Sequence, residues 1–167
     1  MSSFHVRKQH GNRALQRALQ LLREWGFHPI LNGVEFTATP EELEGLHRDP
    51  RELSWEELCR RFAPDLQISA LVEVKMVRDL EAPIVPAWGL LAHLELAREG
   101  EIIIYLFIDP AGDYKWVPIA RLRPQVLFLT DPADIQFFRE KFPDVDIVLL
   151  KRTNGSGAPF LRCHVTP

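Results

Sequence analysis

The chain has 167 residues, 46% of them hydrophobic and 26% charged, which is typical of one soluble globular domain with a single core. Its formal net charge of −3 gives no support to a protein that is basic over its whole surface, although a local basic patch is compatible with it. No apolar run approaches the roughly 18 residues of a membrane helix, no apolar signal segment opens the chain, and Cys59 and Cys163 lack metal-ligand spacing, so we expect a cytoplasmic protein with free thiols and no membrane contact.

Residues 8–25 are predicted to form an amphipathic helix, with Gly26 as its stop. The apolar stripe of this helix consists of Leu15, Ala18, Leu19, Leu22 and Trp25. The opposite face carries Arg13, Gln16 and Arg17. Arg13 and Arg17 lie one turn apart, so they are candidates for contacts with the phosphates of a substrate, or else they are ordinary exposed helix arginines.

Residues 27–39 predict a hairpin made of a short strand, a turn at Asn32-Gly33 and a second strand. Two capping boxes follow, in each of which a Thr or Ser precedes a Glu by three residues. They predict two short helices, at about 40–47 and 54–62, joined by a polar loop.

The segment from Pro64 to Lys75 contains the most informative pattern of the chain. Around Glu73 the residues alternate with period two, which is typical of a β-strand and places Glu73 and Lys75 on one face. Charges on a half-buried strand are costly unless they are paired or bound to a metal. With Asp65 on the preceding strand, a metal site is the natural candidate, and the alternative is an edge strand with a surface Glu-Lys pair.

A helix is predicted at about 86–99, with His93 beside its apolar stripe and Gly100 as its stop. The continuous apolar run of residues 102–108 predicts a strand that is covered on both faces. Because a strand, a helix and a strand in this order form a right-handed crossover, we expect this strand to lie parallel to the strand of Glu73.

Residues 109–167 are predicted to extend the same sheet, and the sequence leaves open whether they also form a dimer surface or contact substrate. Asp131-Pro132 is expected to open a helix that ends near Phe142. The other expected elements are a turn at 109–113, strands at 114–119, 126–129 and 147–150, a turn at 154–157 and a strand at 160–165.

Pro64-Asp65, Glu73 and Lys75 together resemble the signature of the PD-(D/E)XK nuclease superfamily, with seven residues between Asp65 and Glu73. The order of helix, three strands, helix and strand over residues 8–108 is also similar to the core order of that family. The resemblance implies an α/β fold of the restriction-endonuclease-like type, with a mixed sheet flanked by helices and a C-terminal α+β extension. It also implies Mg²⁺ or Mn²⁺ held by Asp65, Glu73 and the carbonyl of Val74. Lys75 would orient the attacking water, and would accept a proton if burial lowered its pKa.

The chain departs from the family pattern on its first helix, where no acid precedes Glu24. Gln16 would replace that acid as a polar ligand, or else it lies on a solvated face, and Glu35 is a further candidate for a third acid. His93 would supply an extra polar group near the scissile phosphate, or else it is a histidine at the edge of the core with a hydrogen bond.

We therefore expect a metal-dependent DNA endonuclease that acts on branched or repair intermediates, of the Holliday-junction-resolvase-like or repair type, as a homodimer. Two alternatives stay open: a nuclease fold that has lost catalysis and serves as a binding or assembly module, and a nuclease that acts on RNA.

The proposed site makes a prediction about strand register. Asp65 and Glu73 can share a cation only if both side chains leave the same face of the sheet. A two-residue turn at Ser69-Ala70 would place Asp65 opposite Val74, on the wrong face, whereas a three-residue loop at 68–70 would place Asp65 opposite Glu73. We therefore predict a connection of odd length or a bulge with the same effect.

Overall fold

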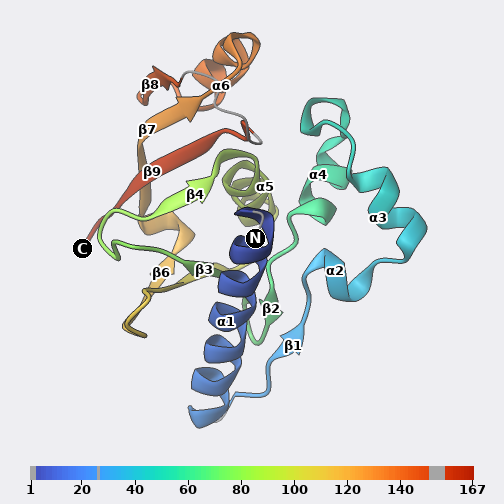
Figure 1. The fold of residues 1–167 in the computed structure, drawn as a ribbon, viewed down its shortest axis with the longest axis vertical. Helices are drawn as coiled ribbons and strands as arrows, with labels where there is room; N and C mark the ends of the chain where they lie inside the picture. The colour runs from blue at the N-terminus through green and yellow to red at the C-terminus, as the bar shows by residue number, and fades with distance from the viewer. Residues whose placement is uncertain (1–2, 26, 151–156) are drawn as a thin grey trace.

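The computed structural model describes residues 3–25, 27–150 and 157–167, and it shows an α/β protein with two mixed sheets (Figure 1). The first sheet has the strand order β1-β2-β3-β5-β6. Its strands are β1 (Ile30–Leu31), β2 (Leu66–Gln67), β3 (Leu71–Met76), β5 (Ile103–Ile108) and β6 (Tyr114–Pro118). The expected parallel pairing of the two central strands is confirmed, because β3 and β5 pair in parallel, with Glu73 beside Tyr105.

Two long helices cover opposite faces of the first sheet. Ala14 and Ala18 of α1 (Ser3–Glu24) pack against Val72 and Val74 of β3. Helix α5 (Ala87–Arg98) lies against the other face and packs on Tyr105 and its apolar neighbours. Successive residues of a strand point to opposite faces, so Glu73 and Lys75 point to the α5 side. Both helices were predicted from the sequence, although α1 begins earlier than residue 8 and its expected stop, Gly26, lies outside the described residues.

The predicted hairpin at residues 27–39 is wrong in its second half. After β1 the chain forms a short helix, α2 (Val34–Thr37), instead of a returning strand. The reason is that the backbone N–H groups of Asn32 and Gly33 donate to the carbonyl oxygen of Asp65, at 2.9 and 3.3 Å. This pairing continues the contact between β1 and β2, so Asn32-Gly33 is attached to a distant segment and does not close a local turn.

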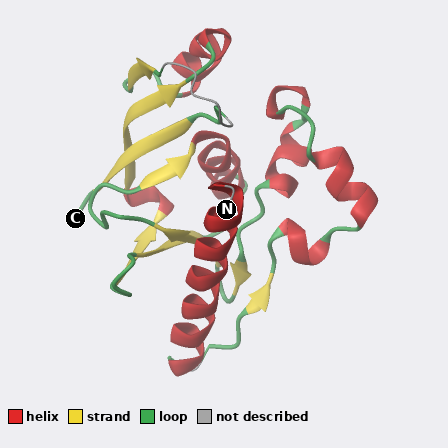
Figure 2. Cartoon of the chain, viewed as in Figure 1, coloured by secondary structure: helices red, strands yellow, loops and turns green. Residues whose placement is uncertain are grey.

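Helices α3 (Pro40–Leu46) and α4 (Trp55–Arg61) confirm the two predictions from capping boxes, since Thr39 with Glu42 and Ser54 with Glu57 make both reciprocal hydrogen bonds. Figure 2 shows these helices gathered on one side of the molecule, away from the second sheet. A single 3₁₀ turn, η1 (Pro50–Glu52), joins them.

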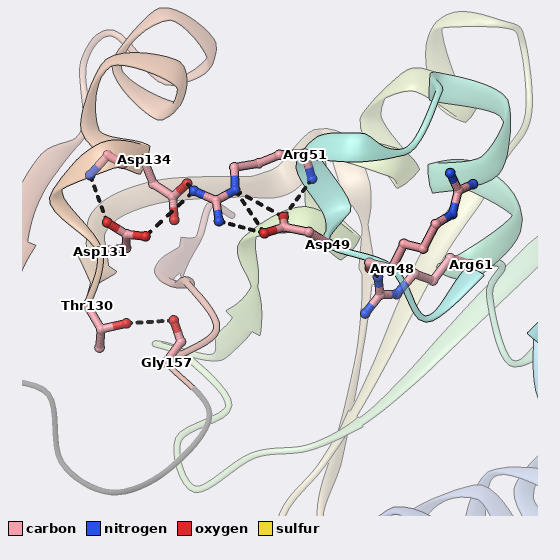
Figure 3. A network of polar contacts seen from close by, with 9 residues as sticks. Arg48, Asp49, Arg51, Arg61, Thr130, Asp131, Asp134 and Gly157 are labelled. Carbon is pink, nitrogen blue, oxygen red and sulfur yellow. Dashed lines mark hydrogen bonds and ion pairs between the residues drawn. The ribbon is translucent and has the colours of Figure 1, made fainter. Parts of the chain in front are cut away.

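An arginine of η1 ties this helical insertion to the second half of the chain (Figure 3). Arg51 forms a close pair with Asp49, with Nη2 to Oδ2 at 2.5 Å, and its Nη1 lies 3.6 Å from Asp131 and 3.4 Å from Asp134. Both of these acids belong to the turn that opens the last helix. The insertion is thus held at α5 by the packing of α4, and the ion-pair network joins it to the turn that opens the last helix.

Residues 109–167 do not extend the first sheet as predicted, because only β6 joins it. A second sheet has the order β4-β9-β7-β8. Its strands are β4 (Ile84–Pro86), β7 (Leu122–Leu129), β8 (Asp146–Leu149) and β9 (Phe160–Val165). The physical reason is a 3₁₀ turn after Pro118, η2 (Ile119–Arg121), which redirects the chain, and pairing of β9 with β4 from the segment before α5.

The other predicted elements of this region are present. Asp131 caps η3 (Pro132–Asp134), which leads into α6 (Ile135–Lys141), and the expected turn at 154–157 lies mostly outside the described residues. One continuous apolar cluster contains residues of α5 and of both sheets, so α5 is packed between them. None of the described helices is long and apolar enough to cross a membrane.

Candidate active site

The register prediction for Asp65 and Glu73 is confirmed. Leu66 pairs with Val72 and Gln67 pairs with Leu71, which leaves a three-residue connection at 68–70. One further step along the same register places Asp65 opposite Glu73. Leu66 and Val72 belong to the apolar cluster under α1. Asp65 directly precedes Leu66 and Glu73 directly follows Val72, so both acids point to the opposite face, towards α5.

Asp65 is held by backbone groups of two strands. Its carbonyl oxygen accepts the two hydrogen bonds from Asn32 and Gly33, and the Asn32 side chain donates to the carbonyl oxygen of Pro64 at 3.0 Å. Its carboxylate Oδ2 accepts a hydrogen bond of 2.8 Å from the backbone N–H of Val74. The carboxylate is therefore fixed against β3, next to Glu73.

Glu73 and Lys75 form an ion pair on the same face of β3. The Lys75 ammonium contacts Oε1 of Glu73, whose side chain is 8% exposed, while the Lys75 side chain is 31% exposed. With Asp65 ionised, two carboxylates face one ammonium, and the group carries one uncompensated negative charge. A partly buried group of this kind is stabilised by a proton or by a bound cation.

The protonation of the three groups follows from their surroundings. Burial and the charge of Glu73 raise the pKa of Asp65 to about 7. Burial also raises the pKa of Glu73, although the charge of Lys75 opposes the change. Burial lowers the pKa of Lys75, but the carboxylates of Glu73 and Asp65 outweigh burial, so the net pKa is raised. The condition under which Lys75 would accept a proton, a pKa lowered by burial, is therefore not met, and Lys75 is an ammonium at neutral pH.

His93 is buried on α5, beneath the site. Its Nε2 lies 2.6 Å from the carbonyl oxygen of Phe62, which can only accept, so Nε2 carries the proton and Nδ1 accepts from the Tyr105 hydroxyl at 2.7 Å. Burial lowers the pKa of His93 to about 4, so the ring is neutral at pH 7. Of the two interpretations of His93, the structure favours the hydrogen-bonded core histidine, although its Nε2 lies only 3.9 Å from Glu73.

Tyr105 is a residue of this site that the sequence analysis missed. It lies inside the apolar run of β5, is 1% exposed, and is the partner of Glu73 in the parallel register. The sequence could have indicated it, because Tyr105 is the only residue of β5 whose side chain carries a polar group. Its hydroxyl donates to Nδ1 of His93, and Nε2 of His93 donates to the carbonyl oxygen of Phe62. These two hydrogen bonds connect β5, α5 and the end of α4 behind the acids.

The candidates on α1 are not brought to the acids. Helix α1 covers the face of β3 that carries Val72 and Val74, opposite to Asp65, Glu73 and Lys75. In the described part of the chain, no hydrogen bond or ion pair joins Arg13, Gln16 or Arg17 to these residues, and Gln16 is exposed, as expected of a solvated helix face.

Glu35 lies close enough for its charge to raise the pKa of both Asp65 and Glu73. It does not complete a cage, however, because within residues 3–25, 27–150 and 157–167 no three His, Cys, Asp or Glu side chains are arranged to hold a metal ion. The residues present fit a cation held by two carboxylates, and their uncompensated negative charge is the observation that supports such a site.

Comparison of the chain with protein-family models, with curated proteins and with solved structures finds no match.

The buried hydrogen bonds of His93 lead to a prediction about stability. His93→Ala is expected to lower the free energy of unfolding at pH 7 by about 3 kcal/mol, because it leaves a cavity and removes the partners of Tyr105 and Phe62. The pKa of His93 in the folded state, about 4, is below its ordinary value of 6.5. The stability that the neutral ring contributes is therefore present above pH 6.5 and is lost as the pH falls through about 4.

Urea denaturation of the wild type and the variant at pH 7 and at pH 4 measures this difference. It should shrink at the lower pH. His28→Ala, at an exposed histidine, is the matched control and should change stability by less than about 0.5 kcal/mol. An equal loss for both variants would contradict the assignment.

Proposed function

We propose that this protein is a metal-dependent endonuclease that hydrolyses phosphodiester bonds in DNA, with Asp65, Glu73 and Lys75 at its active site. The observation that carries the proposal is the register of β2 against β3, which brings Asp65 opposite Glu73 on one face, with Lys75 beside them. The element order supports it further. With α2, α3 and α4 inserted after β1, and β4 of the second sheet before α5, the chain keeps the order α1, three neighbouring strands, α5 and the parallel strand β5 that is similar to the core of the PD-(D/E)XK nucleases.

Asp65, Glu73 and the carbonyl of Val74 would hold Mg²⁺ or Mn²⁺, which in such sites lowers the pKa of a bound water and offsets charge on the phosphoryl oxygens. Asp65 must lose its proton to act as a ligand. Because its pKa is about 7, we expect activity to rise with pH through neutrality. Lys75 keeps its proton and supplies a positive charge that attracts a phosphate oxygen and orients a water molecule.

Tyr105 and His93, which lie behind the acids, would support this chemistry by holding the acids in place. Tyr105 is hydrogen-bonded to neutral His93, and His93 is hydrogen-bonded to the carbonyl oxygen of Phe62, so the two side chains form the side of the site that faces α5 without adding charge. They are positioning residues for Glu73, and His93 is not the acid or the base of the proposed reaction.

A second proposal has some support. A binding or assembly module with the same fold would explain why the described residues contain no third acidic ligand. The same structure would then bind nucleic acid, DNA or RNA, without cutting it.

The test is a cleavage assay on branched, flapped, linear and single-stranded DNA, and on single-stranded RNA, with Mg²⁺, Mn²⁺ or EDTA. We expect cleavage of at least one DNA with either metal and none with EDTA. Binding without cleavage of any substrate would favour the module, and cleavage of RNA alone would replace DNA as the substrate. Light scattering with and without DNA tests the expected homodimer.

A further inference from the structure

A cavity of about 590 Å³ lies beyond the C-terminal end of β3, in the angle between the two sheets. Figure 1 shows the place, where the chain leaves β3 and returns as β4 beside β9. The first lining residue along the chain is Met76, which directly follows Lys75. The lining residues are Met76, Val77, Arg78, Asp79, Ala82, Ile84 and Arg162. The cavity is thus formed by residues of both sheets and begins one residue after Lys75, although Met76 packs in the apolar cluster under α1 and so points to the other face of β3.

Two arginines from different strands give this cavity a positive charge. Arg78 follows β3, and Arg162 lies on β9 opposite Ile84 of β4. Both are exposed, and within residues 3–25, 27–150 and 157–167 neither forms an ion pair with a carboxylate. The guanidinium of Arg162 lies 5.4 Å from the centre of the Phe128 ring, which restrains it without neutralising it.

The carboxylate in the cavity cancels only part of this charge. Asp79 Oδ1 accepts hydrogen bonds from the backbone N–H groups of Glu81 and Ala82, at 2.9 and 3.2 Å, and so caps the turn before β4. Counting the two arginines and Asp79, the lining residues carry a net charge of +1. In a chain with a net charge of −3, this is a local basic site.

The position of the cavity fits a continuous nucleic acid strand. Arg78 lies three positions after Lys75 in the chain, and three residues of extended chain span at most about 10 Å. That span corresponds to about three steps along the axis of a DNA duplex, where the phosphates of one strand rise by roughly 3.4 Å each. Arginine binds phosphate with two parallel hydrogen bonds, and the apolar side chains of Met76, Val77 and Ile84 suit the carbon atoms of sugars and bases.

We propose that Arg78 and Arg162 bind backbone phosphates of the DNA strand that is cut, a few nucleotides from the scissile bond. This inference rests on the proposed nuclease function. It gives the site a substrate-positioning groove between the two sheets.

The test measures DNA binding with EDTA present, by fluorescence anisotropy at several salt concentrations, and cleavage separately with Mg²⁺. The test variant is Arg78→Gln/Arg162→Gln. The control is Arg98→Gln/Arg139→Gln, which removes the same charge at exposed positions of α5 and α6 outside the cavity. Melting temperatures verify that both variants fold.

We expect the test variant to bind DNA about 10- to 100-fold more weakly than the wild type at 0.1 M salt, with the slope of log K against log salt reduced by about two. The control should lose less than about threefold. If the test and control variants bind equally, the groove is refuted, whether or not the wild type cuts DNA.

The same data separate this inference from the proposed function. Selective loss of binding in the test variant, with no cleavage by the wild type, would support the groove and refute the nuclease. Cleavage by the wild type, with normal binding and cleavage by the test variant, would support the nuclease and refute the groove. No binding of DNA by the wild type would refute the groove.

Discussion

Replacing Asp65 by Asn, or Glu73 by Gln, is expected to lower the rate of metal-dependent DNA cleavage by at least about 100-fold, the scale of one lost electrostatic contact in a transition state. Both replacements keep the size of the side chain, and the amide oxygen introduced by Asp65→Asn can still accept the hydrogen bond from Val74. What they remove is the negative charge that would hold the cation. Single-turnover cleavage with Mg²⁺ and circular dichroism of each variant measure activity and folding together.

The matched control is Glu99→Gln, which removes the same charge from an exposed position at the end of α5. It should leave cleavage unchanged. Lys75→Ala is expected to reduce cleavage as well, because it removes the positive charge beside Glu73. Full activity of the Asp65 and Glu73 variants would exclude this site. A clear loss of melting temperature in both, without metal, would indicate a structural role of the ion pair with Lys75.

The second large effect is on stability. Without metal at pH 8, Asp65→Asn is expected to raise the free energy of unfolding. The pKa of Asp65 is about 7 in the folded protein, against an ordinary value of 3.8. Each pH unit between the two values corresponds to about 1.4 kcal/mol, so the gain approaches about 4 kcal/mol as an upper limit.

The sign follows from the raised pKa. The folded protein holds a proton on Asp65 that the unfolded chain releases, so the stability from this group is fully present below about pH 4. It falls as the pH rises and is lost above about pH 7. The advantage of Asp65→Asn over the wild type should therefore be greatest at pH 8 and shrink towards pH 4. Urea denaturation of both proteins at pH 4, 6 and 8 measures it, and a variant that is less stable than the wild type at pH 8 would contradict the burial of this charge.

Magnesium gives the complementary result. A ligand that binds only the folded state raises its stability by mass action. At pH 8, Mg²⁺ should raise the melting temperature of the wild type and leave that of the Asp65→Asn/Glu73→Gln double variant unchanged. An equal rise in both proteins would show that the ion binds elsewhere.

Several elements were predictable because their causes lie within a few residues. The capping boxes of α3 and α4 are reciprocal hydrogen bonds between residues three apart, and the apolar stripe of α1 repeats within each turn. The register of Asp65 and Glu73 was predictable for a related reason. The period of a strand is two, so the requirement for a shared face already implied a loop of odd length.

The protonation and support of the site were not predictable in this way. Whether Lys75 keeps its proton depends on two carboxylates, Glu73 on the same strand and Asp65 from another segment. The neutral state of His93 depends on burial, which outweighs the opposing effect of its hydrogen bond to Phe62. Apart from the Glu73–Lys75 pair, these are contacts between residues far apart in the chain. Their electrostatic effect depends on burial, which no local pattern specifies.

The sequence by itself therefore determined the α1 helix, the two capped helices, the parallel pair β3 and β5, and a strand register that places Asp65 and Glu73 on one face. Only the tertiary structure decided that residues 34–37 are helical and that residues 84–86 form a strand that pairs with β9 in a second sheet. It alone also placed Arg78 and Arg162 in one cavity. The physical reason is that caps and periodicity act within one or two turns of chain, whereas strand pairing and burial are decided by competition among all segments that can reach the same partner.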